Sequence, residues 1–364
     1  MRASSNIADD VWHADPEAGA YEWWYFDAIS DDGRDTLVII FLAGFLFSPA
    51  YNRAVRRHLR GGTARRAAPR PADFPAISIC HYRDGRPRLR VVAEYDPQSF
   101  AASIDRPACR IGRNSFELRA DEHGNNCYVL SLAQPLRRGR ALEAELVWRV
   151  IEGDLLPTQN QSRVEDAGAH DWNLVAPRCD VAGTISVIEK GGGGRFVQRF
   201  AGLGYHDHNR DRRWIPRAVD SWQWGRAHFP SATAVFYRFG EKDAAVLASR
   251  LFTVSNNALD IRQADLQESD RRRNIFGLSY PRQMRFETPG ARTILTVNQK
   301  KVIDSSFFYL RFLSEAMLET EDGRQERALA ITEHLAPRAL AWPALWWLIN
   351  MRIGKADRRA SFLP

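Results

Sequence analysis

The chain has 364 residues, a net charge of +7 and a hydrophobic fraction of 45%, with 11 Trp, 19 Phe and 10 Tyr. This composition excludes a disordered chain, and the length predicts two domains in place of one. The sequence pI is about 9.4, but no zinc-finger, helix-turn-helix or RNA-recognition pattern accompanies the arginines, so nucleic-acid binding is not expected.

Cysteine usage and apolar runs indicate the compartment. The four cysteines are spread widely and form no C-x-x-C pair. The first ten residues are polar and acidic, unlike a signal peptide. The longest apolar run, residues 37–47, is too short to span a bilayer. We therefore expect reduced thiols and a cytoplasmic protein.

The first half of the chain predicts an antiparallel β domain. Residues 21–27 are aromatic, and their alternation places Glu22, Trp24 and Phe26 on one face. A turn signal at 31–33 and an apolar segment at 36–47 predict a hairpin. Further strand-like segments follow at 76–82, 88–95, 115–120, 128–132 and 142–150. Short strands at such spacing are typical of a barrel or sandwich.

An arginine-rich segment, residues 52–70, interrupts these strands. We expect a solvated loop there. The alternative is contact with acidic lipid headgroups, to which each nearby cation contributes about 1 kcal/mol.

The second half predicts another β domain. The polar stretch 159–168 is the expected junction, and strand-like segments follow at 180–189, 195–203, 233–239, 245–254, 284–288, 292–299 and 307–313. We predict domains at 1–165 and 166–335, followed by a short helical tail at 336–364. No glycine-rich phosphate loop follows a strand, so no nucleotide cofactor is expected.

The tail is rich in tryptophan and has basic flanks. Such a segment is typical of an interfacial membrane anchor. A C-terminal helix docked on its own protein is the alternative.

The stretch 204–209 carries the main candidate site. If the strand before it continues, Tyr205, Asp207 and Asn209 share one face, and His206 and His208 share the other. An acid flanked by a phenol and an amide, with tryptophans close in the chain, indicates a proton donor in an aromatic pocket. A buried, hydrogen-bonded strand end is the structural alternative.

His170 and Trp172 also share a face under this alternation. If the two domains pack with their strand ends facing, this pair can meet Tyr205 and Asp207. A metal centre at His206 and His208, with His170 or His228 as third ligand, is not favoured because the spacing is not that of a known site. No G-x-S-x-G motif supports a nucleophilic serine.

Several motifs together resemble a known family. They are Glu22-Trp23-Trp24-Tyr25-Phe26-Asp27, Phe47-Ser48-Pro49, His170-x-Trp172, Gly204-Tyr205-His206-Asp207-His208-Asn209, Trp222-x-Trp224-Gly225-Arg226 and Phe307-Phe308-Tyr309-x-Arg311. The chain resembles the carotenoid 1,2-hydratases, or hydroxyneurosporene synthases, along nearly its whole length. This resemblance implies two lipocalin-like β domains and hydration of a terminal isoprenoid double bond without a metal or redox cofactor.

The resemblance also implies roles for individual residues. The family's functional aspartate falls on Asp207, its tyrosine on Tyr205 and its His-x-Trp pair on His170 and Trp172. As contacts to an apolar substrate we expect Trp24, Asn209, Trp222, Trp224 and Arg226.

Acid-catalysed hydration requires Asp207 in its neutral form, so we expect burial to raise the pKa of this carboxyl above its usual value near 4. His170 would then position or deprotonate the water. Where the hydratases commonly continue with Trp-Gly after the asparagine, this chain has Arg210-Asp211-Arg212-Arg213. These charges indicate a more polar substrate than a carotene. Two alternatives use the same pocket: a cyclase or pericyclase acting on a polyene, and a carrier of an apolar ligand.

Overall fold

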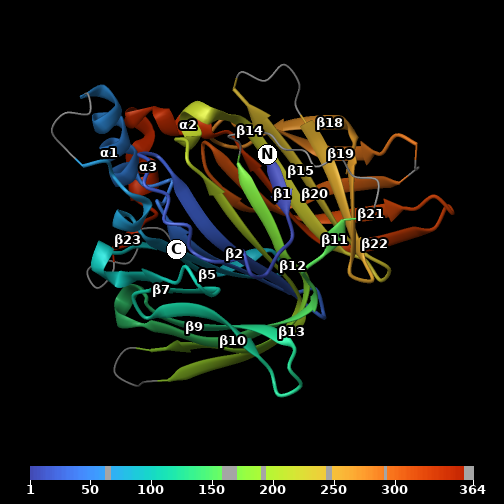
Figure 1. Cartoon of the computed structure of the whole chain (residues 1–364), viewed down its shortest axis with the longest axis horizontal. Helices are drawn as coiled ribbons and strands as arrows, with labels where there is room; N and C mark the ends of the chain where they lie inside the picture. Colours follow the sequence, from blue (N-terminus) through green and yellow to red (C-terminus); the bar gives the residue numbers. More distant parts are fainter. Residues whose placement is uncertain (62–66, 158–169, 190–193, 243–247, 291–292, 356–364) are drawn as a thin grey trace. The chain divides into compact units, whose positions relative to one another are not determined.

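The computed structural model describes the chain except for residues 62–66, 158–169, 190–193, 243–247, 291–292 and 356–364. The chain divides into two compact units. The first comprises residues 1–154, 164–214 and 343–364, and the second comprises residues 155–163 and 215–342. Each unit is built on one curled, mainly antiparallel sheet (Figure 1), which confirms the predicted fold class.

The sheet of the first unit has the strand order β23-β5-β4-β3-β2-β13-β12-β10-β9-β8-β7-β6, and β1 pairs with β12. Its strands are β1 (Arg2–Ser4), β2 (Tyr21–Ser30), β3 (Asp35–Ala43), β4 (Ala76–Arg83), β5 (Arg86–Glu94), β6 (Phe100–Ala102), β7 (Ala108–Ile111), β8 (Asn114–Ala120), β9 (Asn126–Pro135), β10 (Ala141–Glu152), β12 (Asp171–Ile188), β13 (Arg195–Asp211) and β23 (Gly354–Lys355).

The core of this unit follows from period-two alternation. In β10, Leu142, Ala144, Leu146 and Trp148 are buried, while the residues between them are more exposed. Side chains of one strand point alternately to the two faces of a sheet. The buried set packs into one apolar cluster with residues of β2, β3 and β4.

A glycine allows β13 to approach its neighbours closely. A Cβ on Gly204 would lie 2.6 Å from Trp148 Nε1 and 2.8 Å from the Asp27 carbonyl oxygen, and would also collide with Val181. These two atoms are themselves joined by a hydrogen bond, in which Trp148 Nε1 donates to the Asp27 carbonyl at 3.2 Å. Only glycine therefore fits at this position.

The sheet of the second unit has the order β11-β17-β16-β15-β14-β22-β21-β20-β19-β18. Its strands are β11 (Leu156–Pro157), β14 (Val219–His228), β15 (Thr233–Glu241), β16 (Ala248–Ser255), β17 (Ala258–Gln263), β18 (Asp265–Arg273), β19 (Ser279–Glu287), β20 (Ile294–Ser305), β21 (Tyr309–Glu319) and β22 (Gln325–Leu335). Its core contains Phe236, Met284, Phe286 and Leu295.

The helices are short. They are α1 (Pro49–Arg60), α2 (Ile215–Ala218), α3 (Trp346–Asn350) and the 3-10 turns η1 (Pro71–Asp73), η2 (Pro97–Ser99), η3 (Arg137–Gly139), η5 (Pro337–Ala341) and η6 (Pro343–Leu345). No helix in the described part of the chain combines the length and the apolar character needed to cross a bilayer.

The structure differs from the sequence prediction in its domain division. The predicted boundary at 165/166 assigns β12 and β13 to the second domain, but both strands pair within the first sheet, where β13 lies against β2. The division instead falls after Trp214. The expected junction, 159–168, lies outside the described residues. The predicted tail, 336–364, is also divided, because residues 336–342 belong to the second unit and 343–364 to the first.

The arginine-rich segment was expected to be a loop, and that expectation is wrong for its first part. Residues 49–60 form α1, whose N-cap Ser48 accepts hydrogen bonds from the backbone of Ala50 and Tyr51. Ser at the N-cap followed by Pro in the first turn is a helix-start signal. The helix buries Tyr51, Asn52 and Val55 against the first unit.

Candidate active site

Asp207 lies at the centre of a hydrogen-bonded cluster in the first unit. Tyr205 Oη donates to Asp207 Oδ2 at 2.7 Å, and Trp172 Nε1 donates to the same oxygen at 2.8 Å. Asn209 Nδ2 donates to Oδ1 at 2.8 Å. Asp207 is 3% exposed. The side chains of Tyr205, Asp207 and Asn209 thus lie on the same face of β13, as the alternation predicted.

His170 joins the same cluster through Asn209. Its Nε2 lies 2.9 Å from Asn209 Oδ1, and because an amide oxygen only accepts, Nε2 carries the hydrogen. Nδ1 then faces the Tyr21 hydroxyl at 3.4 Å. Burial lowers the pKa of His170 to about 4, against the opposing effect of Asp211. The ring is therefore neutral near neutral pH.

Strand pairing brings these residues together. Trp172 lies directly opposite Asn209 in the antiparallel pair of β12 and β13, and cross-strand neighbours on one face approach within contact distance. The sequence argument expected the same meeting, but from packing of two domains. The contact instead arises within one sheet.

Strand β2 adds aromatic groups that the sequence argument missed. In the pairing with β13, Tyr25 is opposite Asp207 and Trp23 is opposite Asn209, so both share the face of the acid. The Tyr21 and Trp23 rings stack at 5.0 Å. Asp27, opposite Tyr205, is a second fully buried carboxyl on this face. The sequence did contain a signal for them: Tyr21, Trp23 and Tyr25 occupy alternate positions of the aromatic segment 21–27 and therefore share a face.

The opposite face of β13 carries a separate ionic network. His206 stacks on Phe26 at 3.8 Å, and its Nε2 lies 2.9 Å from Asp10 Oδ2. His208 bridges two carboxylates, with Nδ1 at 3.1 Å from Asp10 Oδ1 and Nε2 at 2.9 Å from Glu22 Oε1. Although burial opposes both shifts, these contacts lower the pKa of Asp10 to about 2 and raise that of His208 to about 9.

This network places three potential metal ligands together. Ligand atoms of His13, Glu22 and His208 lie within 4.8 Å of one another. They already satisfy one another, since Glu22 Oε1 lies 2.8 Å from His13 Nδ1 and 2.9 Å from His208 Nε2. In this structure the three side chains form one hydrogen-bonded network, of which Glu22 and His208 are buried. Of the two third ligands considered from sequence, His170 instead contacts Asn209 in the Asp207 cluster, and His228 lies at the end of β14 in the second unit.

Trp24 was expected to contact the substrate. It instead stacks on His208 at 4.8 Å and belongs to the core of the first unit. The register places it on the face opposite the acid, because Trp24 pairs with His208 and Tyr25 pairs with Asp207.

Trp222, Trp224 and Arg226 lie in the second unit, on alternate positions of β14. All three are buried, and Trp222 stacks on Tyr237 at 5.6 Å. On β21, Arg311 is ion-paired with Glu333 of β22 at 2.8 Å. The contact of Trp222, Trp224 and Arg226 with a substrate remains a prediction.

The charged residues after Asn209 are satisfied within the protein. Arg210 pairs with Asp15 and Asp171, Arg212 pairs with Asp15, and Arg213 pairs with Asp211. These ion pairs give the segment a structural role, so it no longer indicates a polar substrate.

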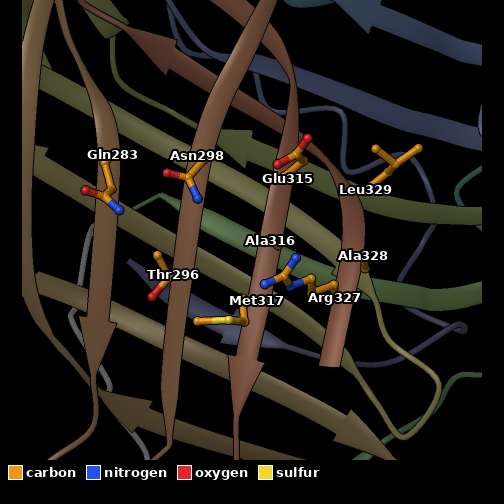
Figure 2. Close-up of a pocket in the computed structure, with 9 residues that line it drawn as sticks. All are labelled: Gln283, Thr296, Asn298, Glu315, Ala316, Met317, Arg327, Ala328 and Leu329. Carbon is orange, nitrogen blue, oxygen red and sulfur yellow. The ribbon is translucent and has the colours of Figure 1, made fainter. Parts of the chain in front are cut away.

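A surface hollow of about 640 Å³ lies on the second unit (Figure 2). Its lining residues are Gln283, Thr296, Asn298, Glu315, Ala316, Met317, Arg327, Ala328 and Leu329. In β20 the lining residues Thr296 and Asn298 alternate with the core residues Leu295 and Val297, so these two side chains point away from that core. It contains none of the predicted site residues.

The fold and the cluster define a class of protein: a mainly β protein with a buried carboxylic acid held by phenol, indole and amide donors. The chain belongs to the carotenoid hydratase CrtC family, whose model matches residues 149–361. The match includes the whole Asp207 cluster on β12 and β13.

Curated relatives agree with this assignment. A hydroxyneurosporene dehydrogenase from Chlorobaculum tepidum is 26% identical over 372 residues, covering 99% of this chain and 94% of the relative. Acyclic carotenoid 1,2-hydratases from Thiocapsa roseopersicina and Rubrivivax gelatinosus are 28% and 30% identical. The matched regions are 60% and 62% of this chain and 47% and 49% of those hydratases.

Solved structures share the fold. A structure from Nitrosomonas europaea described as AttH superposes with a TM-score of 0.60 at 12% identity, covering 92% of this chain and 97% of that chain. CghA with Sch210972 gives a TM-score of 0.58 at 11% identity, covering 88% and 89%. At such identities the likeness concerns the fold alone.

Proposed function

We propose that this protein is a hydratase that adds water to a terminal isoprenoid double bond of a carotenoid-like substrate. Membership of the CrtC family supports the reaction class. The observation that carries the proposal is the buried Asp207 carboxyl, held by Tyr205, Trp172 and Asn209.

Asp207 is the general acid in this proposal. Oδ2 accepts two of the three hydrogen bonds, so we place the acidic proton on Oδ1. Transfer of this proton to the less substituted alkene carbon leaves a tertiary carbocation and the Asp207 carboxylate. The indole of Trp172 lies beside the acid, and an aromatic face stabilises a desolvated cation by about 2 kcal/mol.

Water then attacks the cation and forms the C–O bond. The protonated alcohol loses its proton to a base. We assign this role to His170, which is neutral and hydrogen-bonded to Asn209. Because Nε2 already carries a hydrogen, Nδ1 is the nitrogen that accepts the proton. Return of one proton from His170 to Asp207 restores the starting state, and the net reaction is alkene plus water to tertiary alcohol.

Incubation with an acyclic carotene in ¹⁸O-labelled water tests the reaction. The expected product is an alcohol that carries one solvent oxygen, formed by the wild type and lost in Asp207→Asn. A cyclised product without solvent oxygen would show a cyclase, and unchanged substrate bound to the protein would show a carrier. Either result would reject hydration.

We further propose that the protein works in the cytoplasm in peripheral contact with a membrane, where an apolar substrate is dissolved. The four cysteines are buried and form no disulfides, as is common in a reducing compartment. Recovery of the native protein in the membrane and soluble fractions of its host, before and after a high-salt wash, tests this placement.

A further inference from the structure

We propose that α1 and α3 form a docking surface for membranes that contain anionic phospholipids. The surface consists of Arg53, Arg57, Leu59 and Arg60 on α1 and Trp347 on α3. The inference rests on the proposed function in one respect only, namely that a carotenoid-like substrate is reached through a lipid phase.

The first observation is the charge of α1. The helix contains four arginines and no acidic residue. Its buried face, with Tyr51 and Val55, packs on the first unit, which directs Arg53, Arg57 and Arg60 to solvent. Within the described part of the chain, no carboxylate lies at ion-pair distance from these three arginines. Several other surface arginines of this unit do have such a partner, for example Arg2, Arg34 and Arg149.

The second observation is the exposed apolar side chains beside these charges. Trp347 is 58% exposed and Leu59 is 44% exposed. Tryptophan next to basic residues is typical of segments that lie at the boundary between lipid headgroups and acyl chains. Water is a poor environment for such a side chain, whereas that boundary accommodates both the ring and its N–H group.

The two helices are held together as one surface. The guanidinium carbons of Arg53 and Arg56 lie 5.8 and 5.7 Å from the ring centroid of the buried Trp346, the residue before Trp347. Figure 1 shows α1 and α3 side by side, as these contacts require. The charged and aromatic residues therefore approach a partner together.

Lipid is a better match than nucleic acid for this combination. A phosphate backbone would satisfy the arginines but would leave Leu59 and Trp347 without an apolar partner. Anionic headgroups satisfy the cations, and the acyl region accepts the apolar side chains.

Vesicle sedimentation tests the proposal. The full-length protein is mixed with phosphatidylcholine vesicles, with or without phosphatidylglycerol. The wild type is expected to bind the anionic vesicles at least tenfold more tightly. Arg53→Gln/Arg57→Gln/Arg60→Gln should lose at least tenfold of this affinity. The matched control Arg137→Gln/Arg138→Gln/Arg140→Gln removes the same charge from η3 and the residue after it, and should bind as the wild type does.

The aromatic contribution is tested separately. Trp347→Ala should weaken binding several-fold, whereas Phe196→Ala, which removes a side chain of 62% exposure on β13, should not. Equal binding of the wild type to both vesicle types, or equal losses in the two arginine triples, would overturn the proposal. Tighter binding to a DNA duplex than to anionic vesicles would also overturn it and favour a nucleic-acid surface.

Turnover separates this proposal from the proposed function. With detergent-dispersed carotene the arginine triple at 53, 57 and 60 should react as fast as the wild type, and with carotene in anionic vesicles it should be at least tenfold slower. If no form of the protein hydrates carotene, the proposed function fails while the vesicle-binding result stands by itself.

Discussion

Trp172 and Asp207 are joined by a hydrogen bond between neighbouring strands, in which the indole Nε1 donates to carboxyl Oδ2 at 2.8 Å. The same oxygen accepts from Tyr205. The acid therefore has one fixed orientation. Its second oxygen, Oδ1, accepts from Asn209 at 2.8 Å and is the oxygen to which we assign the acidic proton.

Asp207→Asn tests the acid most directly. The amide keeps the shape of the side chain but has no acidic proton, so we expect kcat for hydration to fall by about 10²–10⁴-fold, the usual contribution of a general acid. Steady-state kinetics with circular dichroism as a check of folding would measure this. Asp32→Asn, on an exposed turn, should keep wild-type activity. Retention of full turnover by Asp207→Asn would remove Asp207 from the mechanism.

Tyr205→Phe removes one of the three donors to Asp207 while keeping the ring. We expect kcat to fall by about tenfold, in line with the loss of a hydrogen bond to a charged group, with KM little changed. Because a donor to the carboxylate form is lost, activity should persist to higher pH than in the wild type. A pH–rate profile identical to that of the wild type would show that Tyr205 has only a structural role.

His170 should make the stability of the protein depend on pH. Its pKa is about 4 when folded and about 6.5 when unfolded. Between these values the unfolded state binds more protons, so stability decreases as the pH falls through this window, by about 3 kcal/mol at most. The free energy of unfolding, measured with urea across pH 4.5–7.5, a range set roughly by these two pKa values, should therefore depend less steeply on pH for His170→Gln than for the wild type.

The control for this experiment is His123→Gln, because His123 is largely exposed. The free energy of unfolding of this variant should depend on pH as that of the wild type does. If His170→Gln also kept the wild-type pH dependence, the folded protein would not keep His170 neutral.

Gly204→Ala should destabilise the first unit by about 1–3 kcal/mol, the usual cost of adding a methyl group to a packed core. The new Cβ would meet Trp148 Nε1 and the Asp27 carbonyl oxygen. Gly194→Ala, where a Cβ meets nothing within 4 Å, is the matched control and should leave the unfolding midpoint nearly unchanged. Equal midpoints for the two variants would show that β13 can move to accommodate the methyl group.

Much of the candidate site could be predicted from local patterns. Period-two alternation is a property of any strand, so Tyr205, Asp207 and Asn209 had to share a face once residues 195–211 were extended. The same rule separated them from His206 and His208. The aromatic motifs likewise led to the family that the comparisons confirm.

Other features were decided only by the tertiary structure. The strand that lies beside β13 is determined by contacts between residues distant in the sequence. Pairing with β2 places Tyr25 beside the acid and Trp24 on the opposite face. The same pairing kept β12 and β13 in the first unit. Arg210 and Arg212 both form ion pairs with Asp15, a residue far away in the sequence. Alternation assigns side chains to faces, but register and strand order decide what each face meets, because they depend on contacts between residues distant in sequence.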